Sequence, residues 1–334
     1  MAAENGKTGY VKSELVTVFG GSGFVGRHVV RALARRGYRV RAAVRRPDLA
    51  NFLQPLGGVG QIHAVQANIR NRASIDRAVA GSGAVVNLVG ILYESGRQRF
   101  DAVQSFGPGA IAAAAKEAGI GTMVHVSSIG ADTESESDYA RSKSAGEAAV
   151  FKAFPAAVIL RPSIIFGPED DFFNRFGAMA RLSPVLPLIG GGTTRFQPVF
   201  VGDVAEAVAR GVDGNLKPGT IYELGGPEVR TFKQLMEYIL EVTDRRRLLA
   251  PLPLEIARMK ARFLQLFPNP LLTVDQVRQL AHDNVVSAAA ITDGRTLEGI
   301  GIDPRAIESV VPTYLARFRK AGQFTEPDRA APGL

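Results

Sequence analysis

VFGGSGFVG, residues 18–26, places three glycines at intervals of three directly after a short apolar run. Gly20 would permit a tight turn from strand to helix, Gly23 a close approach of the backbone to a pyrophosphate, and Gly26 close packing of the helix on the sheet. A helix that begins near Phe24 directs free backbone N–H groups and the positive end of its dipole at a phosphate. Because the stretch follows the first predicted strand and opens the first predicted helix, it predicts a dinucleotide site rather than an unliganded turn.

Strand-like and helix-like segments alternate through the first half of the chain. The segment 25–37 has apolar residues at helical spacing, arginines on its other side and a glycine at its end. Repetition of strand and helix at this spacing predicts an α/β fold, a doubly wound parallel Rossmann sheet with helices on both faces. The predicted strands are 15–19, 38–44, 61–67, 84–90, 122–128, 156–162 and 220–226.

The alternation loosens after Pro162, and the chain becomes mainly helical from about residue 228. Residues 196–212 predict a strand and a helix that return to the sheet. We expect an NAD(P)-binding domain and a smaller, mainly helical C-terminal lobe, with flexible ends. The domain is expected over 13–166 with completion by about 196–227, the lobe over 167–195 and 228–325, and the ends over 1–12 and 326–334.

Composition narrows the class of protein. The chain has 334 residues, 46% of them apolar and 22% charged, which is ordinary for a folded domain, and it has no stretch of 18 apolar residues. Its 40 basic and 32 acidic residues give a net charge of +8, which favours anionic partners, but no nucleic-acid motif accompanies that charge. The absence of cysteine and the scattered positions of four histidines predict no metal site. No signal peptide is recognisable at the N-terminus, so a cytoplasmic location is expected.

The end of the second predicted strand bears on the choice of dinucleotide. NAD-binding folds usually carry an acid there, whereas this chain reads AAVRRPD, with Arg45 and Arg46 in that place and Asp48 beyond a proline. Arginine suits a 2′-phosphate through bidentate contacts, so NADP(H) is preferred and NAD(H) stays possible. The alternative is that both arginines are solvated surface charges, which fits Arg46 better than Arg45.

Later strand ends supply further candidates for cofactor contacts. Asn68 could bond the edge of an adenine, and Asn87 could line a ribose, although either asparagine could be an ordinary turn residue. The full set of expected cofactor-binding residues is Gly20, Gly23, Phe24, Val25, Gly26, Arg45, Asn68, Ile69, Val89, Gly90, Ser127, Tyr139, Lys143 and Pro162.

A candidate catalytic pair lies in SDYARSKSAGE. Tyr139 and Lys143 are four residues apart and share one face of a helix. A neighbouring ammonium lowers the pKa of a phenol and lets it exchange a proton near neutral pH. Ser127 and Ser128 end the preceding strand, where the hydroxyl of Ser128 could meet a substrate carbonyl. Chance alone often produces this Tyr–Lys spacing, but its place behind a dinucleotide motif favours function.

GGSGFVG, NLVG, HVSS, YARSK and LRPSIIFGP together resemble the short-chain dehydrogenase/reductase superfamily in its extended or atypical branch. Three further segments, 161–176, 196–208 and 266–287, resemble the NADPH-binding accessory subunit family of respiratory complex I and its bacterial relatives. This resemblance implies a tightly held NADPH and a structural or assembly role, or a quinone-linked role, with complex I subunits as partners. Active extended enzymes usually carry a third Ser or Thr where this chain has Ile129, so the resemblance leaves the catalytic role of Tyr139 and Lys143 in question.

Residues 251–267 form a candidate membrane-facing segment. Ile256, Met259 and Phe263 recur at helical spacing, while Arg258 and Lys260 lie away from that stripe. A basic amphipathic helix can lie on an anionic membrane, which would make the protein peripheral on the inner face of the cytoplasmic membrane. The alternative is a helix that covers the C-terminal lobe with its apolar stripe and leaves its basic side in water.

Three functional hypotheses follow. The first is an NADPH-binding, short-chain dehydrogenase/reductase-like relative of the complex I accessory subunit. The second is an NADP-dependent reductase or epimerase that uses Tyr139 as acid and base, Lys143 to tune it and Ser128 to orient the substrate. The third is a nucleotide-bound sensor of the NADPH/NADP⁺ ratio, for which the sequence offers no distinguishing residue.

Overall fold

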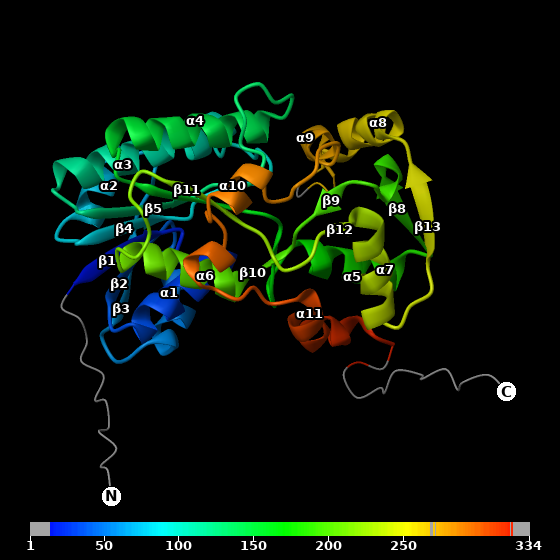
Figure 1. The fold of residues 1–334 in the computed structure, drawn as a ribbon, viewed down its shortest axis with the longest axis horizontal. Helices are drawn as coiled ribbons and strands as arrows, with labels where there is room; N and C mark the ends of the chain where they lie inside the picture. The colour runs from blue at the N-terminus through cyan, green and yellow to red at the C-terminus, as the bar shows by residue number, and fades with distance from the viewer. Residues whose placement is uncertain (1–13, 268–269, 271, 321, 323–334) are drawn as a thin grey trace, which may run out of the picture. The chain divides into compact units, whose positions relative to one another are not determined.

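The computed structural model of the chain describes residues 14–267, 270, 272–320 and 322 (Figure 1). The ends expected to be flexible, 1–12 and 326–334, lie outside the described residues. The chain forms two compact units, each built from several segments. The first unit contains the described residues up to 127, with 142–160 and 204–222, and the second contains 128–141, 161–203 and the described residues from 223 onward.

A seven-stranded sheet forms the centre of the first unit, in the order β11-β6-β5-β4-β1-β2-β3. β1 pairs in parallel with β2 and β4, β2 with β3, β4 with β5, and β5 with β6. Its strands are β1 (Leu15–Phe19), β2 (Arg39–Val44), β3 (Ile62–Gln66), β4 (Ala84–Asn87), β5 (Thr122–Val126), β6 (Val158–Pro162) and β11 (Ile221–Leu224). This order confirms the predicted doubly wound α/β fold.

Helices cover both faces of this sheet, α2, α3 and α4 on one face and α1 and α6 on the other (Figure 1). Burial explains the arrangement, because strand residues such as Val16 and Val85 are fully buried, as Val29 and Leu33 of α1 are. The helices are α1 (Phe24–Arg35), α2 (Arg72–Val79), α3 (Gly107–Glu117, preceded by a π-helical turn, Asp101–Phe106), α4 (Asp138–Ala153) and α6 (Val201–Val212).

Aromatic side chains form the core of the second unit. Phe172 contacts the rings of Phe173, Phe176 and Phe232 edge to face at centroid distances of 5.2–6.2 Å. The elements around this core are β7 (Ile165–Phe166), α5 (Phe172–Leu182), β8 (Val185–Ile189), β9 (Arg195–Phe196), β10 (Val199–Phe200), β12 (Arg230–Thr231), α7 (Phe232–Val242), β13 (Leu248–Leu252), α8 (Leu254–Leu264), α9 (Val274–Gln279), α10 (Ala288–Thr292) and α11 (Ile307–Leu315).

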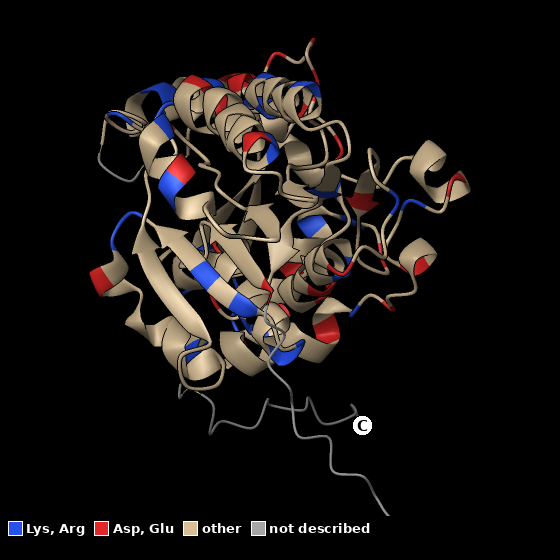
Figure 2. Cartoon of the chain, turned by 90° about the vertical axis from the view of Figure 1, so that its left-hand side faces the viewer, with Lys and Arg blue, Asp and Glu red and all other residues tan. Residues whose placement is uncertain are grey.

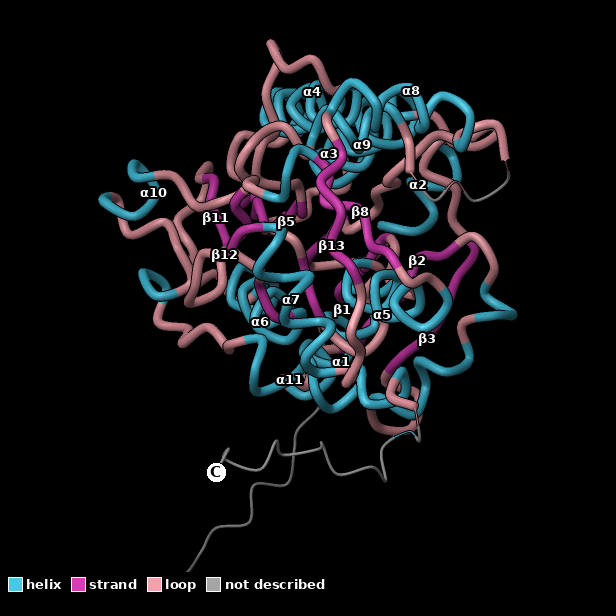
Figure 3. The backbone as a smooth tube through the Cα atoms, turned by 90° about the vertical axis from the view of Figure 1, so that its right-hand side faces the viewer, coloured by secondary structure: helices cyan, strands magenta, loops and turns pink. Residues whose placement is uncertain are grey.

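The small strands of the second unit pair among themselves. Figure 3 shows β8 and β13 side by side, and they pair in parallel over five residues. β9 pairs with β12 and β10 with β7. The expectation that the strand near 196–200 returns to the central sheet is therefore wrong, although α6 does return to the first unit. Residues 251–267 also begin in β13 and become helical only at Leu254.

Basic and acidic residues are spread over many helices and loops in the view of Figure 2, so the surplus of positive charge is not concentrated on one element there. Many arginines are paired locally, for example Arg72 with Asp76 at 2.7 Å. An excess of basic residues dispersed in this way attracts anions weakly in general.

Candidate functional site

The turn between β1 and α1 shows why glycines occur where they do. Gly20 has a φ of 82°, a left-handed conformation that glycine adopts without strain, and its N–H donates to the carbonyl of Ala43 at 3.1 Å. A Cβ placed on Gly26 would lie 2.1 Å from the carbonyl oxygen of Gly20. Gly26 is thus required for close packing against the turn itself, whereas the sequence had suggested packing against the sheet.

The N-terminus of α1 presents unsatisfied donors. Gly23 is the N-cap and provides no side-chain cap, and the first turn contains no acidic residue. The N–H groups of Phe24, Val25 and Gly26 find no acceptor among the described residues. Three unpaired N–H groups at the positive end of a helix fit an anionic group, such as a pyrophosphate.

A pocket of about 310 Å³ lies beside the ends of β2 and β3 and the start of α2. We call it the β3–α2 pocket; its lining residues are Arg45, Gln66, Ala67, Asn68, Asn71, Ser74 and Arg77. The structure thus brings together Arg45 and Asn68, which sequence reasoning had assigned separately to a 2′-phosphate and to adenine. It also adds Arg77, which sequence reasoning missed because α2 carries no motif.

The two arginines after β2 differ in their surroundings. Arg46 forms an ion pair with Asp48 at 2.7 Å. Its guanidinium therefore already has an anionic partner two residues along the chain. Arg45 lines the β3–α2 pocket and pairs with no described residue. The geometry therefore favours Arg45 over Arg46 as the group that meets a ligand.

Asn68 is part of an ordered turn as well as of the pocket. Its backbone N–H donates to the hydroxyl of Ser74 at 3.0 Å, and its side-chain oxygen accepts from the backbone N–H of Arg70 at 3.1 Å. These bonds fix the orientation of the amide and leave its NH₂ group as the donor available to a ligand. Ile69, also expected at the cofactor, is buried and packs its side chain into the core of the first unit.

The end of β4 is held by a buried polar pair. The side-chain amide of Asn87 lies 3.1 Å from Nδ1 of His125 on β5, and its oxygen accepts from the backbone N–H of Val89 at 3.1 Å. Asn87 is thus committed to shaping the turn rather than lining a ribose. Burial, with a smaller contribution from the charge of Lys143, lowers the pKa of His125 to about 3, so the imidazole is neutral at physiological pH.

Lys143 lies inside the first unit near the loop after β4. Its side chain is buried, and its ammonium donates to the carbonyl of Val126 at 3.4 Å. A Cβ on Gly90 would come within 3.4 Å of that ammonium. Gln104 links the loop after β4 to the helix that carries Lys143. Its side-chain oxygen accepts from the N–H of Ile91 at 3.0 Å, and its NH₂ group donates to the hydroxyl of Ser142 at 2.9 Å. Gln104 had no sequence signal, since it precedes α3 and belongs to no motif.

Ser127 offers a hydroxyl with no protein partner. Only 4% of the residue is exposed, and its Oγ has no hydrogen-bond partner among the described residues. A buried polar atom without a partner costs free energy unless a ligand or water satisfies it. This orphaned hydroxyl, the open end of α1 and the β3–α2 pocket fit a bound dinucleotide, and all three belong to the first unit.

The remaining expected residues lie in the second unit. Ser128, Tyr139 and Pro162 belong to its segments 128–141 and 161–203. The hydroxyl of Ser128 is buried and unpaired, and the carbonyl of Pro162 accepts from the N–H of Ile129 at 3.0 Å. Tyr139 lies in α4 one turn before Lys143, as the spacing predicted.

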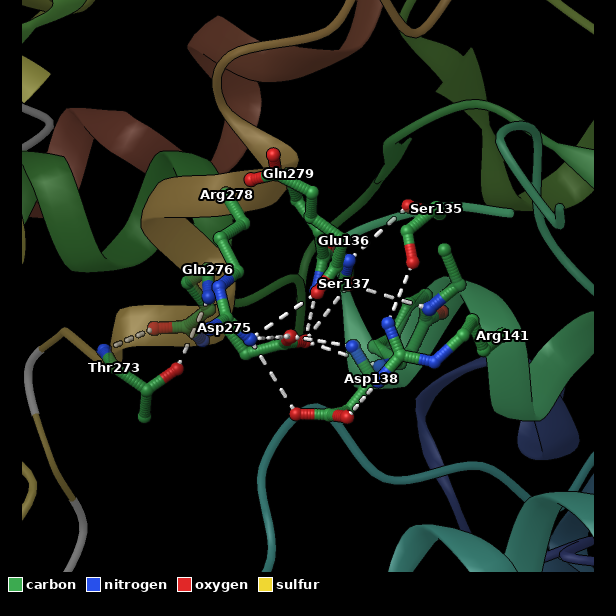
Figure 4. Close-up of polar contacts among 12 residues, drawn as sticks. Ser135, Glu136, Ser137, Asp138, Arg141, Thr273, Asp275, Gln276, Arg278 and Gln279 are labelled. Carbon is green, nitrogen blue, oxygen red and sulfur yellow. Dashed lines mark hydrogen bonds and ion pairs between the residues drawn. The ribbon is translucent and has the colours of Figure 1, made fainter. Parts of the chain in front are cut away.

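A carboxylate from far along the sequence caps the N-terminus of α4 (Figure 4). Asp275 of α9 accepts from the N–H of Asp138 at 2.7 Å, the N–H of Tyr139 at 3.2 Å and the hydroxyl of Ser137 at 2.9 Å. Arg278 of the same helix donates to the carbonyl of Glu136 at 3.1 Å. The start of the helix that carries Tyr139 is thus fixed by α9.

The helix α8 has an unexpected orientation. Its buried residues are Ala257 and Ala261, while Ile256, Met259 and Phe263 are 41%, 55% and 67% exposed. Leu266 and Phe267, just beyond its end, are also exposed. The alternative in which the apolar stripe covers the lobe is therefore wrong, because the small residues take that place. Rows of exposed large apolar side chains are typical of surfaces that bind a partner or a membrane.

Among the residues that the structure describes, no helix combines the length and the apolar character needed to span a membrane. Across the same residues, no group of three or more His, Cys, Asp or Glu side chains is arranged to hold a metal ion.

Comparisons with known proteins agree with this geometry. A family model described as the NAD dependent epimerase/dehydratase family matches residues 16–225. The mitochondrial "NADH dehydrogenase [ubiquinone] 1 alpha subcomplex subunit 9" of Arabidopsis thaliana is 34% identical over 324 residues, which cover 93% of this chain and 80% of that protein. A ceramide reductase of Caulobacter vibrioides is 37% identical over 191 residues, 57% of this chain and 58% of that one.

Among solved structures, the NADPH-dependent quinone oxidoreductase QOR2 of Escherichia coli, in complex with NADPH, superimposes with a TM-score of 0.71. The match covers 90% of this chain and 99% of that one at 19% identity. At that level of identity the likeness concerns the fold alone. It supports the doubly wound α/β architecture described above.

Proposed function

Since this chain belongs to the NAD dependent epimerase/dehydratase family and is related along most of its length to the complex I accessory subunit, we propose that it binds NADPH and serves a respiratory complex as a structural or assembly subunit. The observation that carries the proposal is the extent of the identity, which spans both units. The open end of α1 in the first unit and the exposed apolar side of α8 in the second give the two halves of the proposal a physical basis.

The cofactor half of the proposal assigns each part of the dinucleotide to residues of the first unit. The N–H groups of Phe24, Val25 and Gly26 would hold the pyrophosphate, Asn68 the adenine and Arg45 the 2′-phosphate. Val89, Gly90, Ser127 and Lys143 would line the nicotinamide half. Bound NADPH would supply the hydride donor. A ligand that binds only the native state also stabilises the fold by mass action.

Preference for NADPH over NADH rests on Arg45. We expect Arg45→Ala to weaken NADPH binding by about 10- to 100-fold and NADH binding by less than threefold, as for the loss of a charge-assisted contact. Isothermal titration with both nucleotides measures this, and Arg46→Ala is the matched control because Arg46 is paired with Asp48. Equal weakening of both nucleotides would contradict the 2′-phosphate assignment.

The partner half of the proposal places α8 and the residues just after it against the complex or against the anionic surface of the inner membrane leaflet. The surface of this segment combines large exposed apolar side chains with the basic residues Arg258, Lys260 and Arg262. It suits a partner surface that is apolar at its centre and anionic at its rim. The protein would then be cytoplasmic and peripheral.

Purification of the tagged full chain from detergent-solubilised membranes tests the partner half. We expect complex I subunits, identified by mass spectrometry, to accompany the wild type and to be lost from Met259→Glu/Phe263→Glu. The control is Ile291→Glu, an equally exposed apolar position on α10. Recovery of complex I subunits with the double variant would reject α8 as the interface. Flotation of the same proteins with anionic vesicles separates a lipid surface from a protein one.

A second function has its own support. Tyr139 and Lys143 lie one helical turn apart in α4, the hydroxyls of Ser127 and Ser128 have no protein partner, and one relative is a ceramide reductase. These features favour an NADP-dependent reductase or epimerase in which Tyr139 exchanges a proton, Lys143 assists and Ser128 orients the substrate. Screening for NADPH oxidation with quinones and carbonyl lipids tests this function. Activity that survives Tyr139→Phe would exclude the phenol as the proton donor.

A further inference from the structure

The β3–α2 pocket has an electrostatic property that goes beyond the assignment of Arg45. Two of its seven lining residues, Arg45 and Arg77, carry a positive charge, and none carries a negative charge. Neither guanidinium forms a hydrogen bond or ion pair with any described residue. Two unneutralised cations that line one pocket repel each other, so a bound anion between them would be favoured.

The nearby acids are already occupied. Asp48 is held by Arg46 at 2.7 Å, and Asp76 by Arg72 at 2.7 Å. The neutral lining residues offer amide and hydroxyl groups, which suit the edge of a purine and the oxygens of a phosphate. The pocket therefore combines a polar neutral wall with two free guanidinium groups.

We infer that Arg77 of α2 is a second specificity-determining residue for the 2′-phosphate and clamps it together with Arg45. The inference rests on the proposed NADPH function. A phosphate monoester carries between one and two negative charges near neutral pH, which two guanidinium groups neutralise and which either group alone leaves partly unpaired. With such a clamp, the preference for NADPH over NADH would depend on a residue of α2 as well as on Arg45 at the end of β2.

The test uses small probes that isolate this end of the cofactor. Binding of adenosine 2′,5′-bisphosphate, 5′-AMP, NADPH and NADH is measured by isothermal titration with the full chain. We expect Arg77→Ala to weaken the bisphosphate and NADPH by about 10- to 100-fold and to leave 5′-AMP and NADH within threefold. Arg31→Ala, an exposed arginine on α1 that does not line the pocket, is the matched control for a lost positive charge.

Each outcome decides something different. If Arg77→Ala weakens 5′-AMP as much as the bisphosphate, or changes neither, the clamp is overturned. If Arg45→Ala abolishes the preference for NADPH and Arg77→Ala keeps it, the clamp alone fails and the proposed function stands. If the wild type binds neither dinucleotide, both fail. Partial recovery of bisphosphate affinity by Arg77→Lys supports a charged contact rather than a change in folding.

Discussion

Two helices of this molecule begin in opposite ways. The N-terminus of α1 has a glycine N-cap, no acid in its first turn and three N–H groups without an acceptor. At the N-terminus of α4, the carboxylate of Asp275 accepts from the N–H groups of Asp138 and Tyr139. Both ends carry the same partial positive charge. The difference is that the protein supplies its own anion at α4 and none at α1, which is why we propose α1 as the end that binds the ligand.

The largest expected effect comes from giving α1 a cap of its own. Gly23 has a φ of −73°, so other residues can adopt its conformation, and a Cβ there meets only the carbonyl of Gly20 at 3.3 Å. We expect Gly23→Asp to weaken NADPH binding more than 100-fold, because the carboxylate would occupy the helix end and repel the pyrophosphate. Stability should change by only a few tenths of a kcal/mol.

Gly23→Asn is the control for that experiment, since it adds the same shape and a similar cap without the charge. Titration calorimetry measures the affinity and thermal unfolding measures the stability. If the aspartate and asparagine variants bind NADPH equally, the contrast between the two helix ends does not explain the site.

The reverse change removes the anion from α4. We expect Asp275→Ala to lower the free energy of unfolding by about 2 kcal/mol, because two backbone N–H groups and the hydroxyl of Ser137 lose their acceptor. Chemical denaturation measures the loss. Asp303→Ala, at an exposed acid of the same unit, should cost less than 0.5 kcal/mol. Equal losses from both variants would show that the cap contributes nothing specific.

Unfolding at acidic pH can be used to compare the two helix ends once the contribution of His125 to the pH dependence of stability is known. The folded pKa of His125 is lowered to about 3, below its ordinary value, mainly by burial. The unfolded chain therefore binds the proton first, and the stability present above about pH 6.5 is lost as pH falls. We expect about 1.5 kcal/mol to be lost between pH 6.5 and pH 5 from this residue. Denaturation curves of the wild type and His125→Gln across this range should differ in slope, and equal slopes would contradict the burial argument.

The smallest expected effect concerns the helix that holds the cap. Thr273 forms a capping box with Gln276 at the start of α9. We expect Thr273→Ala to cost about 1 kcal/mol and to speed hydrogen exchange at the N–H groups of Asp138 and Tyr139. Thr231→Ala removes the matching capping box of α7 and should cost a similar amount without that local change. Unchanged exchange in the Thr273 variant would show that Asp275 holds α4 independently of its own helix.

Much of the fold was readable because its signals are local. Each predicted strand of the central sheet is a short apolar run, and each appears within two or three residues of its expected bounds. The prediction failed for 196–200, where a short apolar run pairs with β7 and β12 instead of the central sheet. A two-residue strand carries too little pattern to indicate its partner.

The sequence predicted only those parts of the site that depend on the local chain. Gly20 and Arg45 follow strands directly, so their places are fixed by the local chain. Arg77 and Asp275 act through contacts that depend on how separate elements pack, and neither lies in a motif. The orientation of α8 was ambiguous because hydrophobic spacing gives greatest weight to the large side chains, whereas Ala257 and Ala261 pack inward.

The cap on α4 also has a consequence for how the chain is made. Asp275 lies 138 positions after Ser137, so a ribosome completes α4 and all seven strands of the central sheet before it adds the acceptor that the helix needs. At about 5–20 residues per second, that interval lasts roughly 7–28 seconds. During it the N–H groups of Asp138 and Tyr139 lack the carboxylate that accepts from them in the complete fold. A chain that terminates before α9 would therefore contain every strand of the sheet and still be open at the helix that carries Tyr139.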